Sequence, residues 1–256
     1  MKANTKNNAR RNYDYRVLWL AVREALDRIR PLSDQEARAF FHAPRGNSKT
    51  GEIPAWSLMP GPSCPGRACG TCLLTGCYAC KNAFRGGYKF SEESGRPDGK
   101  INMTLRAWAE NTALVLNRLP VFVDCMREFL AEYSKAGGGL FRIHAAGDFK
   151  TLAYALAWKE LAEEFPDVRF LAFTKDWESA EALPFDSLPN FSLVLSAWPG
   201  LAVPDSLRAR YRVSWCQDGT EDRIPEDAMH CPGDCETCGL CWFLEDIGRD
   251  VWFTKH

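Results

Sequence analysis

The chain has 256 residues, of which 46% are hydrophobic and 25% are charged, a composition typical of folded globular proteins and not of disordered ones. No run approaches the roughly 18 apolar residues of a membrane span. The polar, basic stretch 1–16 also lacks the apolar core of a secretory signal. We therefore expect a cytoplasmic protein without a membrane partner.

The net charge of −1 conceals an uneven distribution. Residues 1–106 carry 18 Lys and Arg against 9 Asp and Glu, whereas residues 107–256 carry 14 against 24. A basic half can face nucleic acid or another anion, or it can face the acidic half of its own chain. Charge alone leaves both interpretations open.

Hydrophobic periodicity and chain breakers predict most of the elements. The expected elements are helices over 15–30, from Ser33, 103–118 and 121–135, then strands over 141–147, 168–174, 191–196, 211–215 and 250–254, with helices over 150–164, 176–182 and 204–209 between them. Ser33 and Glu36 form the pattern of a capping box, and Pro120 separates two of the helices. Residues 43–70 are expected to be irregular.

The alternation of strands and helices in the second half predicts βα units and a parallel sheet. Four or five such strands favour an α/β fold with a partial (β/α) barrel, an N-terminal helical segment and two cysteine-rich metal-binding loops. We expect a disordered basic tail over 1–12 and one α/β metal-binding domain over 13–256. Its helical, cysteine-rich part is 13–102 and its βα-repeat part is 103–256.

Polar residues stand at the carboxyl ends of these strands, where functional groups of parallel sheets gather. The candidates are His144, Gly147, Asp148, Thr174, Lys175, Ser196 and Lys255. A purely structural explanation needs only turns and helix caps, with His144 as a satisfied core histidine. We expect the polar residues to share one mouth of the fold.

Cysteine is the outlying residue type, because nine of the 11 fall in two clusters. They are Cys64, Cys69, Cys72, Cys77 and Cys80, and then Cys231, Cys235, Cys238 and Cys241. In a reducing compartment, such clusters indicate metal or iron–sulfur ligation before disulfides. Close spacing favours a [4Fe–4S] cluster. Zinc usually takes two separated pairs, and a pair from each cluster is the alternative.

Cys72, Cys77 and Cys80 form C-x4-C-x2-C, with Tyr78 inside. This stretch resembles the C-x3-C-x2-C motif of radical S-adenosylmethionine enzymes but is one residue longer. The resemblance implies three ligands and one open iron, which the methionine part of S-adenosylmethionine chelates. The second cluster offers Cys241 as a fourth ligand, which indicates a closed auxiliary or structural site.

Several segments together resemble the phage gene-product-88 family of phages and mobile elements. They are residues 46–51, 63–66, 77–79, 141–149, 173–175, 238–242 and 251–256. The resemblance implies a metal-dependent mobile-element protein without specifying a reaction. In that family the cysteine of Cys-Tyr-Ala tends to be the last of its group, so the open cluster uses Cys64, Cys72 and Cys77, or else Cys72, Cys77 and Cys80.

Three functional hypotheses follow. The favoured one is a radical-SAM-like enzyme supplied by an electron donor, whose protein groups position the cofactors. In it, Gly147 and Asp148 approach the amino group or ribose of S-adenosylmethionine, Thr174, Lys175 and Ser196 hold its carboxylate or the substrate, and His144, Asp148, Lys175 and Lys255 are the catalytic candidates. The second is a nucleic-acid-binding module with structural iron–sulfur or zinc sites, using Arg10, Arg11, Arg16, Lys81, Arg85 and Lys89. The third is an enzyme without S-adenosylmethionine whose cluster is an electron relay or Lewis acid.

Overall fold

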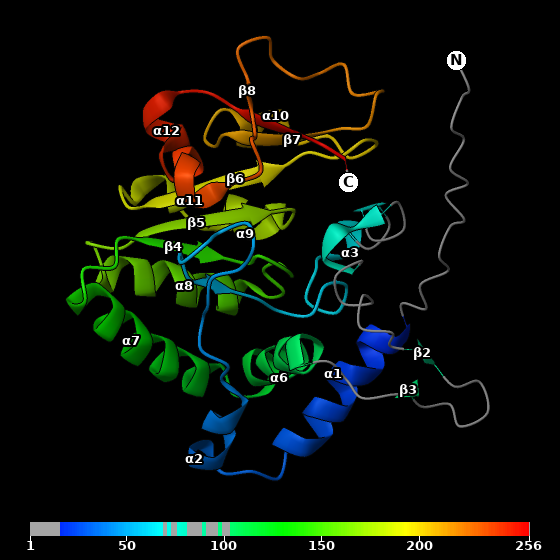
Figure 1. The fold of residues 1–256 in the computed structure, drawn as a ribbon, viewed down its shortest axis with the longest axis vertical. Coiled ribbons are helices and arrows are strands. Elements are labelled where there is room, and N and C mark those ends of the chain that lie inside the picture. Colours follow the sequence, from blue (N-terminus) through cyan, green and yellow to red (C-terminus); the bar gives the residue numbers. More distant parts are fainter. Residues whose placement is uncertain are drawn as a thin grey trace.

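The computed structural model describes residues 16–68, 71–72, 76–80, 89–90, 97–98 and 103–255. The predicted tail over 1–12 and Cys69 lie outside these ranges. The main sheet has seven parallel strands in the order β1-β4-β5-β6-β7-β9-β8 (Figure 1). A second, two-stranded antiparallel sheet pairs β2 (Lys89–Phe90) with β3 (Pro97–Asp98). The predicted α/β class with a parallel sheet is confirmed.

The elements follow the predicted chain order closely. The strands of the main sheet are β1 (Ala55–Trp56), β4 (Leu140–Ile143), β5 (Arg169–Thr174), β6 (Phe191–Ser196), β7 (Val213–Gln217), β8 (Met229–His230) and β9 (Val251–Thr254). The helices are α1 (Arg16–Ile29), α2 (Asp34–Ala37), α3 (Gly66–Ala68), α6 (Met103–Asn117), α7 (Leu119–Lys135), α8 (Leu152–Glu164), α9 (Trp177–Ala182), α10 (Asp205–Arg208), α11 (Cys235–Cys238) and α12 (Leu244–Ile247). Short 3-10 helices are η1 (Arg38–Phe40), η3 (Phe185–Ser187) and η4 (Leu240–Phe243).

Helix starts show how local chemistry sets the boundaries. The Ser33 hydroxyl accepts a hydrogen bond from the Glu36 backbone N–H, and the Glu36 carboxylate accepts one from the Ser33 N–H. The predicted capping box is therefore present. Pro120 lies inside the first turn of α7, where its missing N–H costs no hydrogen bond, so it does not separate the helices as predicted.

Two expectations about strands are corrected. The segment 43–70 is not wholly irregular, because it contains the two-residue strand β1 and the short helix α3. Strand β4 ends at Ile143 and not at 147, because His144 has a φ of 63° and leaves the extended conformation. The short strands β1 and β8 form the two edges of the sheet. Their length gave no periodic signal in the sequence.

The sheet winds in one direction. Strands β1, β4, β5, β6, β7 and β9 lie side by side in chain order, unlike a doubly wound sheet, in which the order reverses. Such winding brings the crossover helices to a single face. The sheet is open, with β1 and β8 at its two ends. The partial-barrel curvature proposed from the sequence stays a prediction.

Two apolar clusters cover the two faces. The larger one packs α1 and α6–α10 against residues such as Phe141, Phe170 and Leu193. The smaller one packs the segment from β8 to α12 against Leu171 and Val194. Figure 1 accordingly shows α7 and α8 on one side of β4 and β5, and α11 and α12 on the other. The C-terminal cysteine loop thus covers the face that the crossover helices leave open.

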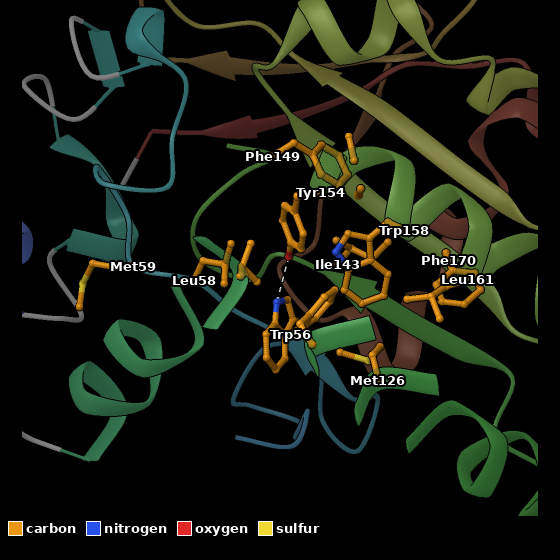
Figure 2. Packing of buried hydrophobic residues seen from close by; sticks show 14 of the residues in the cluster. Trp56, Leu58, Met59, Met126, Ile143, Phe149, Tyr154, Trp158, Leu161 and Phe170 are labelled. Atoms are coloured by element: carbon orange, nitrogen blue, oxygen red, sulfur yellow. Dashed lines mark hydrogen bonds between the residues drawn. The ribbon is translucent and has the colours of Figure 1, made fainter. Parts of the chain in front are cut away.

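Large aromatic side chains fill the main core (Figure 2). Trp56, Phe122, Tyr154 and Trp158 are each 0% exposed. The Trp56 indole N–H donates to the Tyr154 hydroxyl at 3.0 Å, so strand β1 and helix α8 are joined by a buried polar contact as well as by packing. Most buried aromatic N–H and O–H groups in proteins have such a partner.

Glu110 ties the N-terminal helices together. Its side chain is 3% exposed and contacts two arginines and one histidine: Arg28 at 2.7 Å, Arg106 at 2.9 Å and His42 at 2.5 Å. Burial by itself raises the pKa of Glu110, but the hydrogen bonds from His42, Arg106 and Arg28 outweigh it and lower that pKa to about 2. The ionised carboxylate therefore joins α1, α6 and the loop after η1.

Candidate metal and cofactor site

A chain of hydrogen bonds crosses the carboxyl ends of β4, β5 and β6. The Thr174 hydroxyl donates to Asp148 Oδ1 at 2.6 Å, and the Lys175 N–H donates to Asp148 Oδ2 at 2.8 Å. The Lys175 ammonium then donates to the Ser196 hydroxyl at 2.7 Å. Four of the residues predicted to share one mouth are thus brought together.

Asp148 is the buried carboxyl of this chain, with an exposed fraction of 5%. Burial raises the pKa of Asp148 to about 6, although hydrogen bonds from Thr174 and Lys175 favour its ionised form. The group is therefore poised to change protonation near neutral pH. Such a perturbed acid at strand ends is typical of functional sites.

Two lysines that directly follow strands β5 and β9 face one indole ring. The Lys175 ammonium lies 5.3 Å from the centre of the Trp198 ring, and the Lys255 ammonium lies 5.7 Å from it. Lys255 also lies 3.7 Å from the Asp218 carboxylate. Lys255 thus joins the mouth through Trp198, which places two cations where an anionic group can bind.

His144 is separate from this network. It is 3% exposed, and its Nε2 lies 2.9 Å from the Tyr154 hydroxyl, on the side of the aromatic core. Its Nδ1 is buried without a hydrogen-bond partner. Burial, followed by the charge of Arg142, lowers the pKa of His144 to about 3, so the ring is neutral at physiological pH. The ring therefore packs on the aromatic core with one unsatisfied nitrogen, and its proposed catalytic role stays a prediction.

Gly147 has a structural role next to the candidate site. Its φ is +88°, and a Cβ atom there would lie 2.6 Å from the Ser63 hydroxyl and 2.7 Å from the Leu58 Cβ. Only glycine allows the chain after β4 to approach the start of the first cysteine loop this closely. Contact of Gly147 with a cofactor stays a prediction.

The first cysteine loop packs beside the strand ends. The Tyr78 hydroxyl donates to the Ala145 carbonyl, and the Lys150 ammonium lies 3.5 Å from the Cys64 carbonyl. Figure 1 shows α3, which belongs to this loop, beyond the carboxyl ends of the strands. Residues far apart in sequence therefore meet at one edge of the sheet.

Three thiols of this loop interact directly. Hydrogen bonds from Cys72 and then Cys80 lower the pKa of the Cys77 thiol to about 3. The same bonds, together with burial, raise the pKa values of Cys72 and Cys80. Cys64 lies near enough to raise both further, and the charge of Lys175 lowers that of Cys72. Cys77 thus lies between the other two thiols and accepts a hydrogen bond from each.

The second cysteine loop forms a separate group. Cys231, Cys235, Cys238 and Cys241 line one pocket together with Trp242 and Val251, and none of the four is in a disulfide. Burial, followed by the charges of the other three cysteines, raises the pKa of Cys241 to about 12. The loop is held by short contacts: the Asp234 carboxylate caps α11, and the Ser192 hydroxyl donates to the Cys241 carbonyl at 3.0 Å.

The loop 46–51, which had no assigned chemistry in the sequence, supports this second group. The Asn47 side-chain oxygen accepts from the N–H groups of Lys49 and Thr50, which closes the loop on itself. The Cys235 N–H donates to the Lys49 carbonyl at 2.8 Å, and the Glu52 N–H donates to Glu236 at 3.0 Å. The motif therefore holds α11 against the sheet.

Arg142 is a site residue that the sequence analysis missed. It lies in β4, is 6% exposed, and donates from Nη1 to the Cys235 sulfur at 3.7 Å. A single arginine between Phe141 and Ile143 in an otherwise apolar strand was the available signal. Buried arginines need a partner, and such a position in a central strand is uncommon.

Comparison with known proteins places the chain in a family. The family described as Gene product 88 matches residues 32–243. The chain belongs to the Gene product 88 family. The Gene 88 proteins of Mycobacterium phage D29 and Mycobacterium phage L5 are each 31% identical to it, over 145 and 144 residues. These matches cover 46% of this chain and 59% of each relative, so the chain spans less than two thirds of their length. No solved structure matches.

Membership of the Gene product 88 family confirms the predicted phage-family resemblance, and the radical-SAM resemblance stays a prediction. Within the described residues, no three or more Cys, His, Asp or Glu side chains form a group that could hold a metal ion. No helix in the same ranges has the length and apolar character to cross a membrane. Of the basic residues proposed for nucleic acid, Arg10, Arg11, Lys81 and Arg85 lie outside the described ranges, and that hypothesis stays untested.

Proposed function

We propose that this Gene product 88 protein is an iron–sulfur enzyme of the radical-SAM type. In this proposal the first cysteine loop holds an open [4Fe–4S] centre, and the second loop holds a closed one. The main support is that the Cys72, Cys77 and Cys80 thiols interact with one another. Lys175, which belongs to the hydrogen-bonded chain of Asp148, Thr174, Lys175 and Ser196, acts electrostatically on Cys72.

The chemistry of the donor set fits an iron–sulfur cluster. Thiolates are its usual ligands, and Cys77 already favours the thiolate form. A single ion needs sulfurs that converge within about 2.3 Å of one point. A cluster is bound through irons at separate corners, so its thiolates stand wider apart. Cys72, Cys77 and Cys80 hydrogen-bond one another, so they would have to move apart to bind the separate corners of a cluster.

Two ligand sets are proposed for the open cluster: Cys72, Cys77 and Cys80, or Cys64, Cys72 and Cys77. Cys72, Cys77 and Cys80 are linked by thiol hydrogen bonds, which supports this set over one that replaces Cys80 with Cys64. Cys80 is also the most buried of them, at 1% exposed, which suits a ligand shielded from water. Cys64 is close enough to act on both Cys72 and Cys80 and is the remaining candidate.

The strand-end residues supply what a charged cofactor needs. S-adenosylmethionine carries an ammonium group and a carboxylate, which call for one acidic and one basic partner. The Asp148 carboxylate can accept from the ammonium, and the Lys175 ammonium, oriented by Ser196, can bind the carboxylate. When bound and reduced by an electron donor, the cluster supplies one-electron cleavage of S-adenosylmethionine. The protein positions this chemistry and excludes water from it.

The proposal is tested by metal analysis of anaerobically purified protein, with electron paramagnetic resonance spectra of the dithionite-reduced sample before and after S-adenosylmethionine. We expect about eight irons per chain and a spectrum that changes with the cofactor. Cys77→Ser is expected to remove about half of the iron and the cofactor response. Cys125→Ser is the matched control, because Cys125 is a buried core residue of α7.

Two results would overturn the proposal. Zinc without iron would exclude an iron–sulfur enzyme and favour the nucleic-acid-binding alternative, which a low-salt gel shift then tests. About four irons with a spectrum unaffected by S-adenosylmethionine would leave a relay or structural cluster only.

A further inference from the structure

Arg142 is a buried cation without an acidic partner. Its side chain rises from β4 toward the second cysteine loop, and its guanidinium lies 5.2 Å from the centre of the Phe173 ring. Among the described residues, its buried Nε atom has no hydrogen-bond partner, and Nη1 donates to the Cys235 sulfur. In the described part of the chain, no Asp or Glu forms an ion pair with it. The nearby Glu236 is bonded to the Glu52 N–H instead.

The energetics of this position call for negative charge. An arginine does not lose its proton in proteins. Taking an ion from water into the interior costs several kcal/mol after relaxation, unless an opposite charge compensates it. A single sulfur at 3.7 Å and an aromatic face provide only weak compensation. The position of this buried guanidinium therefore calls for an anionic centre on the side of the Cys235 sulfur.

We propose that Arg142 is the counter-cation of an anionic metal–thiolate centre formed by Cys231, Cys235, Cys238 and Cys241. This inference rests on the closed site of the proposed function and adds the residue that stabilises it. Four thiolates exceed the charge of a divalent ion or a cluster core by about two units, so the centre is negative for either metal. The guanidinium lies at its base, on the sheet.

The small apolar core on this face gives a second physical reason for a metal centre there. Residues 229–247 cover the open side of the sheet with only a small apolar cluster, which includes Leu171, Val194 and Trp242. A metal bound by the loop adds the stabilisation that this small core lacks, because a structural centre contributes its binding energy to folding. Hydrogen bonds to cluster sulfurs also raise the reduction potential, so Arg142 is expected to raise the potential of this centre.

The test compares Arg142→Met and Arg142→Lys with the wild-type full chain. Each is reconstituted with ferrous iron and sulfide, and in parallel with zinc alone. The readouts are metal per chain and the rate of metal release to a chelator. We expect Arg142→Met to release the metal of the second loop at least tenfold faster, and Arg142→Lys to retain it. Arg118→Met is the matched control, because Arg118 is a half-buried arginine bonded to the Arg30 and Leu32 carbonyls and paired with Asp34.

A second readout separates this role from simple packing. In metal-free protein, Arg142→Met removes an uncompensated buried charge, so its resistance to urea is expected to equal or exceed that of the wild type. Equal metal release from Arg142→Met and wild type would refute the role of Arg142, as would a loss of stability of the metal-free variant.

The closed site itself is tested by Cys235→Ser. If this substitution leaves the metal content unchanged, the second loop binds no metal and that part of the proposed function fails. If Cys235→Ser lowers the metal content and Arg142→Met changes neither content nor release, only the inference about Arg142 fails.

Discussion

Asp148→Asn is the substitution whose effect the structure specifies most fully. The pKa of Asp148 is raised by burial from an ordinary 3.8 to about 6, and its side chain is 95% shielded from solvent, so little of this shift is lost to screening. The shift corresponds to about 3 kcal/mol of free energy between the two protonation states. Folding favours the protonated acid by this amount.

The sign of the pH dependence follows from the direction of the shift. Because the folded-state pKa exceeds the unfolded-state value, the stability contributed by Asp148 is full below pH 3.8 and is lost as the pH rises through about 6. Asparagine does not titrate. The stability of Asp148→Asn relative to the wild type should therefore rise by about 3 kcal/mol between pH 3.8 and pH 7. At low pH, the free energy of unfolding of Asp148→Asn should be about 1–3 kcal/mol below that of the wild type. The reason is that one amide N–H then faces the Lys175 N–H.

The assay is urea denaturation of both proteins, prepared in the same metal state, across this pH range. A ¹³C carboxyl titration of the wild type measures the pKa of Asp148 directly. Asp186→Asn is a control of opposite sign, because hydrogen bonds from Arg210 lower the pKa of Asp186. A stability difference between Asp148→Asn and wild type that does not vary with pH would refute the reasoning, as would a carboxyl that titrates below pH 4.

Three further substitutions test the scaffold. Glu110→Gln should lower the free energy of unfolding by about 3 kcal/mol at pH 7, since the pKa of Glu110 falls from 4.5 to about 2 on folding. The difference from the wild type should vanish as the pH falls through 2, and an unchanged acid-unfolding curve would contradict this. Gly147→Ala should cost at least about 1–2 kcal/mol in thermal denaturation, because its φ is positive and the added Cβ would clash with the Ser63 hydroxyl. The substitution should also expose the first-loop thiols to alkylation, and unchanged alkylation would show that the loop does not depend on this contact. Tyr154→Phe should cost about 1–3 kcal/mol in urea denaturation, because the buried Trp56 indole N–H loses its acceptor, and full stability would argue against that bond.

Much of the second half of the fold could be predicted from sequence. Strand β6 was predicted with its observed bounds, and β5, β7 and β9 were predicted within two residues, because apolar runs between helical patterns carry a strong local signal. The edge strands β1 and β8 have two residues each, too few to create a period. Their conformation is imposed by pairing with β4 and β9.

The candidate site was predicted in its parts and not in its connections. The strand-end rule identified Asp148, Thr174, Lys175 and Ser196, and the structure joins them by hydrogen bonds. The same rule included His144, which the structure turns toward Tyr154 and the aromatic core. A residue at a strand end can face either side, and only the backbone angle at that residue decides which.

The sequence by itself determined the alternation of strands and helices, the capping box at Ser33, and the two groups of closely spaced cysteines, because each of these depends on neighbours along the chain. Only the tertiary structure decided that loop 46–51 holds α11, that Lys175 and Lys255 share Trp198, and that Arg142 meets Cys235 across 93 residues. Those contacts join segments whose separation in sequence carries no periodic signal, and they arise only when the parallel strands bring their ends and faces together.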